Sequence, residues 1–450
     1  MLNPSIFKAY DIRGTYPDQL DEDGVYKIGY AFVKHLKVQQ VAVAYDMRTM
    51  NPKLKPSLYQ GIADAGASIV DLGLIGTEMM YFAVGHFNYE SGIMLTASHN
   101  PPQYCGMKMV SKGAYPIGIE TGLKEISEIA LALESQTTHV EPSITTQEVF
   151  SAYREKINSL VDLSSLKKFK IVVDAGNGMG GYMLERILNN TNLEIIPMYF
   201  EPDGTFPNHI PDPMKEENVQ ALAARVKAEN ADLGIGLDGD ADRCFFVDNT
   251  GEAFLGYFVV AIIAELMLKK YPNSKIVHEP KVYWAIQDKV RENGGTPLLE
   301  KTGHSFIKAR MRQEDSVFGG ETSSHFYYKY TAYADSSFLT IALMLENLQK
   351  KNLNLSDIMA EYKKKYFLSG EINYTVQNAD TTIQKVEDFY TSQGLVADKL
   401  DGIAFDKDRD WHMSLRKSNT EPLVRLNIEA KSQDLVAKIT SEVENIIKAN

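Results

Sequence analysis

The chain has 450 residues, with 47 Lys and Arg against 59 Asp and Glu, and carries a formal net charge of −12. This length exceeds what one core supports, so three or four domains are expected. The acidic balance argues against non-specific binding to nucleic acid or to an anionic membrane. Two cysteines are too few for a disulfide framework, and no apolar run suggests an export signal or a membrane span, so we expect a cytoplasmic location.

An alternation of strand, helix and strand recurs at 41–72, 170–200 and 275–312. Such repetition predicts consecutive α/β domains with parallel or mixed sheets. After about Tyr366 the order changes to a strand, a helix, two strands and a last helix, which predicts a separate α+β domain. The fold class expected is therefore a multidomain α/β chain, with domains at 1–148, 149–249, 250–365 and 366–450.

A serine stands where a buried strand breaks into a loop. Segment 92–108 begins with apolar residues and turns polar at Ser98, just before two prolines. Open α/β sheets bind ligands at such strand ends. A serine hydroxyl becomes a nucleophile only when a partner takes its proton or stabilises its oxygen. A lone loop serine is more often a helix cap, so Ser98 needs support from the rest of the chain.

Three aspartates, Asp238, Asp240 and Asp242, alternate between two predicted strands. Like charges about 4 Å apart repel by several kcal/mol at an effective dielectric near 20, which favours a cation among them. Oxygen ligands favour magnesium, manganese or calcium over zinc. A calcium-binding EF-hand is excluded because Arg243 and Asn249 stand where that loop needs Gly and Glu. A plain Asp/Gly turn is the alternative at this point.

Three further loops carry groups suited to a phosphorylated sugar, although each is unspecific alone. Glu321 follows a short predicted strand, and a carboxylate can accept from two neighbouring hydroxyls. A basic segment at Lys301 runs into a helix start, which favours an anion. The last inter-strand loop offers donors that match phosphate oxygens, namely Arg416, Ser418, Asn419 and Thr420, with Arg425 nearby.

Five motifs together resemble the α-D-phosphohexomutase family, in its bacterial phosphomannomutase/phosphoglucomutase branch. They are Tyr10-Asp-Ile-Arg13-Gly, Thr96-Ala-Ser-His-Asn-Pro, Asp238-Gly-Asp-Ala-Asp-Arg, Gly320-Glu-Thr-Ser-Ser-His and Arg416-Lys-Ser-Asn-Thr-Glu-Pro. Their order and spacing extend the resemblance over essentially the whole chain. It implies three α/β domains and a C-terminal domain like the TATA-binding protein, placed around a central cleft to which each contributes one loop.

The resemblance implies reversible phosphoryl transfer between the 1- and 6-positions of mannose or glucose phosphates, through phosphoserine at Ser98 and a bisphosphorylated sugar. Mg²⁺ would be held by Asp238, Asp240, Asp242 and a phosphate oxygen on Ser98. Acid, base or charge-stabilising groups would be Arg13, Lys108, His304 and His325. Substrate contacts would come from Tyr10, Arg243, Lys281, Glu321, Ser323, Arg416, Ser418, Asn419, Thr420 and Arg425. Glucose 1,6-bisphosphate or mannose 1,6-bisphosphate would activate a monomer or small homo-oligomer.

Two positions depart from the family pattern: Ser324 replaces a glycine in the sugar loop, and Cys105 replaces an asparagine. A side chain at 324 would force a different backbone angle if that glycine were needed for positive φ. Phosphoglucosamine mutase is the alternative within the same chemistry, although Asn419 replaces the glycine of that branch. A non-catalytic sugar-phosphate-binding paralogue and a metal-dependent phosphatase are alternatives from other classes.

Overall fold

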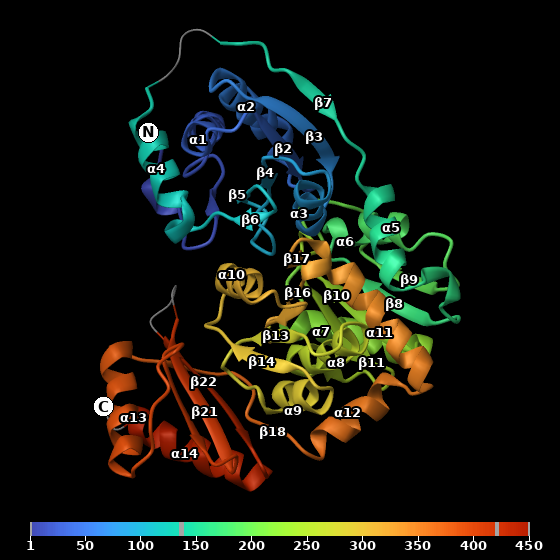
Figure 1. Cartoon of the computed structure of the whole chain (residues 1–450), viewed down its shortest axis with the longest axis vertical. Coiled ribbons are helices and arrows are strands. Elements are labelled where there is room, and N and C mark those ends of the chain that lie inside the picture. Colours follow the sequence, from blue (N-terminus) through green and yellow to red (C-terminus); the bar gives the residue numbers. More distant parts are fainter. Residues whose placement is uncertain (1, 135–138, 419–422, 449–450) are drawn as a thin grey trace. The chain divides into compact units, whose positions relative to one another are not determined.

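The computed structural model describes residues 2–134, 139–418 and 423–448 (Figure 1). The chain folds into two compact units. One comprises Met1–Phe254 and His325–Leu355, and the other comprises Leu255–Ser324 and Ser356–Asn450. Among the helices of the described ranges, none combines the length and the apolar character required to cross a membrane.

The first sheet of the first unit is mixed and has the strand order β1-β5-β4-β2-β3-β7, with β6 beside β5. Strands β2, β3 and β4 run parallel, whereas β5 is antiparallel to both β1 and β4. Every residue of β4 is buried, so the strand that leads to Ser98 is held in place by packing on both faces. The bounds are β1 (Ile12–Thr15), α1 (Glu22–Leu36), β2 (Gln40–Tyr45), α2 (Asn51–Asp64), β3 (Ser68–Leu74), α3 (Thr77–His86), β4 (Ser91–Leu95), β5 (Tyr104–Ser111), β6 (Tyr115–Pro116), α4 (Leu123–Ala132) and β7 (Ile144–Thr146).

The second sheet of this unit has the strand order β12-β11-β10-β8-β9. Strand β8 runs parallel to β9 and β10, and β10 pairs antiparallel with β11 from Leu237↔Cys244 onward, so the three aspartates lie on the connection between them. The bounds are α5 (Phe150–Leu160), β8 (Lys170–Asp174), α6 (Met179–Ile187), β9 (Glu194–Met198), α7 (Glu216–Glu229), β10 (Leu233–Leu237), β11 (Cys244–Asp248) and β12 (Ala253–Phe254). The unit also contains β16 (Phe326–Tyr328), β17 (Ala334–Asp335) and α11 (Ser337–Lys351).

In the second unit, β14, β13 and β15 pair in that order and run parallel. Helix α8 is buried from Gly256 to Leu268, so this continuous apolar run is a core helix. The bounds are α8 (Gly256–Lys270), β13 (Lys275–His278), α9 (Trp284–Glu292), β14 (Thr296–Leu299), α10 (His304–Glu314), β15 (Phe318–Gly320) and α12 (Leu355–Lys363).

The last sheet is antiparallel, with the order β18-β22-β21-β20 and with β19 beside β22. Helices α13 (Ala379–Ser392) and α14 (Gln433–Lys448) lie beside this sheet (Figure 1, orange and red). Tyr390 of α13 and Val443 of α14 join a core with Met413 and Leu426 of the strands. This is the expected α+β arrangement. The bounds are β18 (Phe367–Leu368), β19 (Ile372–Thr375), α13 (Ala379–Ser392), β20 (Ile403–Lys407), β21 (Trp411–Lys417), β22 (Leu423–Ala430) and α14 (Gln433–Lys448).

Candidate active site

Ser98 lies on the connection from β4 to β5 and is only 3% exposed. Its φ of 49° places it in the left-handed region, which non-glycine residues rarely adopt. Its Oγ donates to Oδ2 of Asp238 at 3.0 Å and lies 3.2 Å from Nδ1 of His99, while its backbone N–H donates to Oγ1 of Thr96 at 2.9 Å. The hydroxyl therefore faces a carboxylate at hydrogen-bond distance in a buried loop, the geometry that an activated nucleophile requires.

Asp238, Asp240 and Asp242 are all buried on the β10–β11 connection, and one ligand atom from each lies within 4.8 Å of the others. Ala241, with a φ of 59°, makes the turn that brings them together. Burial of a charge is costly unless it is compensated. Burial raises the pKa of Asp238 to about 7, although the adjacent Arg243 opposes this shift.

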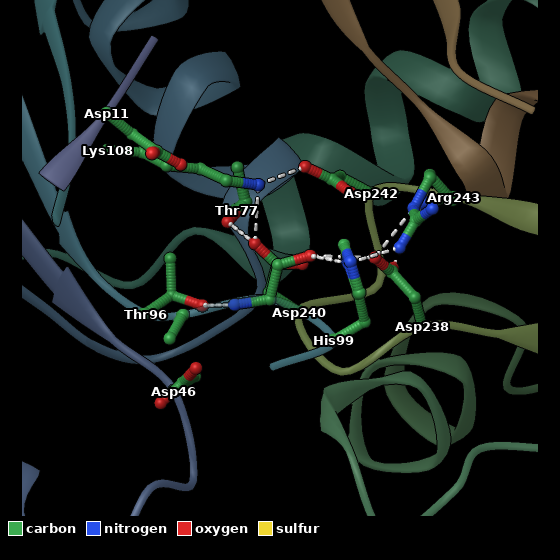
Figure 2. Close-up of polar contacts among 12 residues, drawn as sticks. Asp11, Asp46, Thr77, Thr96, His99, Lys108, Asp238, Asp240, Asp242 and Arg243 are labelled. Carbon is green, nitrogen blue, oxygen red and sulfur yellow. Dashed lines mark hydrogen bonds and ion pairs between the residues drawn. The ribbon is translucent and has the colours of Figure 1, made fainter. Parts of the chain in front are cut away.

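Two cations partly offset these carboxylates (Figure 2). Lys108 Nζ lies 2.7 Å from Asp240 Oδ2 and 2.5 Å from Asp242 Oδ2. Arg243 Nε donates to Asp238 Oδ2 at 2.9 Å. The buried Oδ1 of Asp240 has no hydrogen-bond partner among the described residues. An acceptor left over in an all-oxygen cluster fits a hard divalent cation, so the three aspartates could hold a metal.

Arg13 and His325 also reach this cluster. Arg13 pairs with Asp11 at 2.8 Å and donates to the carbonyl of Ala97 at 3.2 Å, directly beside Ser98. His325 Nε2 lies 3.9 Å from Asp242 Oδ1. Tyr10 is half-buried in the turn before β1. The first unit thus gathers the predicted nucleophile, the three predicted metal ligands and the predicted cations Arg13, Lys108 and Arg243.

The second unit contains the predicted sugar-binding groups. Glu321 follows β15 and accepts from the backbone N–H of Gly303, which precedes His304 at the start of α10, at 3.0 Å. Lys281 Nζ lies 3.3 Å from Thr322 Oγ1, so it contacts the loop that carries Glu321 and Ser323. Lys281, Glu321 and the start of α10 at His304 therefore lie close together, although they come from three different segments.

Ser324 has a φ of 65°, so this position is in the left-handed region even with a side chain, and the different backbone angle considered from the sequence is not adopted. Its side chain is also buried, with 1% of the residue exposed. Serine therefore adopts the left-handed conformation at this position, and its Cβ makes that conformation less favourable than it would be for glycine.

The two arginines predicted to bind phosphate lie side by side on neighbouring strands. Arg416 on β21 is the register partner of Arg425 on β22, and Glu371 lies 3.7 Å from the first and 3.0 Å from the second. Ser418 follows β21 and its N–H donates to the carbonyl of Leu423 at 3.0 Å. Two adjacent guanidinium groups suit an anion. The predictions for Asn419 and Thr420 fall outside the described residues.

Sequence reasoning missed three residues of this neighbourhood. His99 accepts from Arg243 Nη2 at 2.6 Å, and burial lowers its pKa well below the usual value. The hydroxyl of Thr77 donates to Asp240 Oδ2, and its N–H donates to the Asp240 carbonyl at 3.0 Å. Arg48 contacts the serine loop. A threonine at a helix start resembles an ordinary cap, so only His99, adjacent to Ser98, carried a usable signal.

Fold and site together define an α/β protein of several sheets in which a buried serine faces convergent carboxylates. Models of the phosphoglucomutase/phosphomannomutase family match residues 4–137, 151–251 and 256–366 as alpha/beta/alpha domains I, II and III, and 371–446 as the C-terminal domain. The chain belongs to this family, as its motifs predicted, and the expected fold class is confirmed.

Individual relatives agree with this assignment. The chain is 41% identical over 446 residues to a protein named phosphohexose mutases from Xanthomonas campestris, covering 98% of this chain and 99% of the relative. It is 40% identical over 457 residues to an Escherichia coli phosphomannomutase, with 99% of each covered. The crystal structure of a phosphoglucomutase/phosphomannomutase family protein from Burkholderia thailandensis superposes with a TM-score of 0.88 at 32% identity, covering 100% of this chain and 98% of that one.

Proposed function

We propose that this chain is a phosphohexose mutase that moves a phosphoryl group reversibly between the 1- and 6-positions of mannose and glucose phosphates, with Ser98 as the carrier. The observation that supports this most directly is the 3.0 Å hydrogen bond from Ser98 Oγ to Asp238, within a buried carboxylate cluster flanked by cations. A protein that only bound sugar phosphates would not need this combination of nucleophile and metal ligands.

Asp238, Asp240 and Asp242 would hold magnesium. When bound, magnesium supplies positive charge where the transferring group gathers negative charge. The protein's own cations add to this charge, because Arg13, Lys108 and Arg243 lie around the same carboxylates. Phosphoryl transfer depends mainly on positioning and on such electrostatic stabilisation.

Two transfers complete the reaction. In the first, phosphorylated Ser98 gives its phosphoryl group to the free hydroxyl of a hexose monophosphate, which becomes a 1,6-bisphosphate. In the second, the sugar returns its other phosphoryl group to Ser98 and leaves as the isomeric monophosphate. Glucose 1,6-bisphosphate or mannose 1,6-bisphosphate would phosphorylate an enzyme that has lost its group.

Substrate recognition would rest on the second unit. Glu321 and Ser323 would bind the sugar hydroxyls, and Arg416, Ser418 and Arg425 would bind the phosphate that is not being transferred. Glucose and mannose differ only at the second carbon, so a loop that holds the third and fourth hydroxyls would accept both. We also propose four domains, with boundaries after residues 148, 249 and 365. Two free, buried cysteines, Cys105 and Cys244, suit a reducing cytoplasm.

Phosphorus NMR tests the proposal directly. Purified protein with magnesium and a trace of glucose 1,6-bisphosphate receives glucose, mannose and glucosamine 1-phosphates in separate tubes. We expect 6-phosphates from glucose and mannose, and none with Ser98→Ala. Ser91→Ala is the matched control, because Ser91 is a buried serine on β4 whose hydroxyl contacts only the carbonyl of Gln40 among the hydrogen bonds of the described side chains. Free phosphate would identify a phosphatase, and unchanged substrate in every tube would favour a binding paralogue.

A further inference from the structure

Arg48 is a fully buried cation outside the proposed reaction. It follows β2, and its side chain has 0% exposure. Its Nη2 donates to the carbonyls of Ser98 at 2.7 Å and Asn100 at 2.8 Å, and its Nη1 donates to those of Pro101 at 3.0 Å and Tyr104 at 2.9 Å. One guanidinium therefore contacts four backbone carbonyls, three in the loop that carries Ser98 and one at the start of β5. The rigid plane of an arginine fixes these carbonyls relative to one another.

The guanidinium is itself held in place from behind. Asp46 Oδ2 lies 3.5 Å from Arg48 Nε, and Asp46 Oδ1 accepts from the Arg48 backbone N–H at 3.0 Å and from Asn51 Nδ2 at 2.8 Å. The ring of Phe206 lies 5.4 Å from the guanidinium carbon, within the range of a cation–π contact. Arg48 thus joins the Ser98 loop to Asp46 through an ion pair and to Phe206 through a cation–π contact.

The loop needs such support because its nucleophile is in an unfavourable conformation. Ser98 has a φ of 49°, and for a residue with a side chain this region costs on the order of 1 to 2 kcal/mol. Its carbonyl is buried and must be satisfied, and Arg48 is the donor. Strained residues of this kind persist only where their surroundings hold them.

We propose that Arg48 is a positioning residue that holds the Ser98 loop so that Oγ faces Asp238. This inference rests on the proposed function, since it assumes that Ser98 carries the phosphoryl group. The guanidinium of Arg48 contacts backbone carbonyls of the loop and does not contact the reacting hydroxyl. We therefore expect Arg48 to affect the rate of phosphoryl transfer. Substrate binding through the second unit does not depend on it.

The test compares Arg48→Lys with the wild type in the mutase assay and in the rate at which glucose 1,6-bisphosphate phosphorylates Ser98, followed by mass spectrometry of the intact protein. A lysine keeps the charge but cannot contact four carbonyls at once. We expect kcat and the phosphorylation rate to fall by about 100-fold, which is the effect of displacing a reacting group by about 1 Å. KM should change by less than about threefold.

Leu58→Ala is the control for a loss of stability alone, because Leu58 is a fully buried core residue of the same domain. It is expected to lower the melting temperature while leaving kcat per folded molecule unchanged. An Arg48→Lys variant that behaves like Leu58→Ala would overturn the positioning role. If Arg48→Lys does not fold, Asp46→Asn decides, since it loosens the guanidinium and is expected to reduce kcat by about tenfold; an unchanged kcat there overturns the proposal. Wild-type protein without mutase turnover, or an active Ser98→Ala variant, would instead refute the proposed function itself.

Discussion

At the scale of single residues, one close approach in the candidate site depends on a glycine. A Cβ added to Gly239, between two of the aspartates, would lie 2.4 Å from the carbonyl oxygen of Ser98. Real Cβ atoms do not come this close to backbone oxygen, so the absence of a side chain is what lets the serine loop reach the aspartate loop. Space, and not a positive φ, makes glycine necessary at this position.

Gly239→Ala should therefore displace Ser98 from Asp238. We expect kcat to fall by about 100-fold, because the reacting groups must separate to admit the new methyl group. Gly236→Ala on β10 is the matched control, since its Cβ would meet a side-chain carbon of Pro213 at 3.1 Å, a contact that small shifts relieve. Its kcat should stay within about threefold of the wild type. Steady-state kinetics on both variants checks this, and equal activities would contradict the steric argument.

Whether a residue of the site could be predicted depends on how far along the chain its partners lie. The three aspartates could be predicted because their residue type and spacing within one loop favour a metal, whereas Ser98 was predicted only from the combination of motifs along the chain. Arg48 and Thr77 could not, because their role exists only through partners 50 and 163 positions away. Gly239 lay inside a recognised motif, but nothing in the sequence indicates which backbone lies against it.

At the scale of elements, a carboxylate of β22 caps a helix that lies far away in the sequence. Glu429 is fully buried and accepts from the backbone N–H of Tyr283 at 2.7 Å, from that of Trp284 at 3.1 Å and from the hydroxyl of Tyr257 at 2.9 Å. The two backbone donors lie at the N-terminal end of α9, whereas Tyr257 belongs to α8, so Glu429 ties the last sheet to both helices. Burial raises the pKa of Glu429 to about 8, against an ordinary value of 4.5.

This shift makes the stability of the second unit depend on pH. Between about pH 4.5 and about pH 8 the folded state binds a proton that the unfolded state has lost, so the free energy of unfolding decreases as pH rises. We expect the melting temperature to fall across this range in the wild type and to vary less in Glu429→Gln, which keeps an acceptor but does not titrate. Calorimetry at several pH values measures both slopes. Glu361→Gln, an exposed site on α12, should keep the wild-type slope, and equal slopes for all three proteins would be evidence against this account.

Elements with strong local patterns were predictable. The apolar runs at 41–45 and 170–174 appear as β2 and β8. A strand that is buried on both faces is a continuous apolar run, which can be recognised from its own residues alone. The two-residue strand β18 has no such pattern and forms only by pairing with β22. Contacts such as that of Glu429 with α9 are likewise set by tertiary packing, which periodicity does not encode.

At the scale of the whole molecule, the candidate chemistry is divided between the two units. Ser98 and the carboxylate cluster belong to the first unit, while Glu321, Arg416 and Arg425 belong to the second. The two sets also have opposite charge preferences, since three buried carboxylates favour a cation and two paired arginines favour an anion. The metal ion and the phosphate that is not being transferred should therefore act on different parts of the chain.

Hydrogen exchange with magnesium alone tests this division. A ligand that binds only the folded site slows the local opening of the segments that hold it, so exchange should slow in 96–108 and 238–244 and stay unchanged in 411–418. At about 100 times its dissociation constant the ion would stabilise the site by about 2.7 kcal/mol, enough to reduce exchange there by about 100-fold. Asp240→Asn should abolish the effect, whereas Asp248→Asn, at the far end of β11, should preserve it. Protection that persists in Asp240→Asn would place the ion elsewhere. Equal protection of 411–418 would mean that the metal acts on both units, and the division of chemistry drawn from the fold would then be wrong.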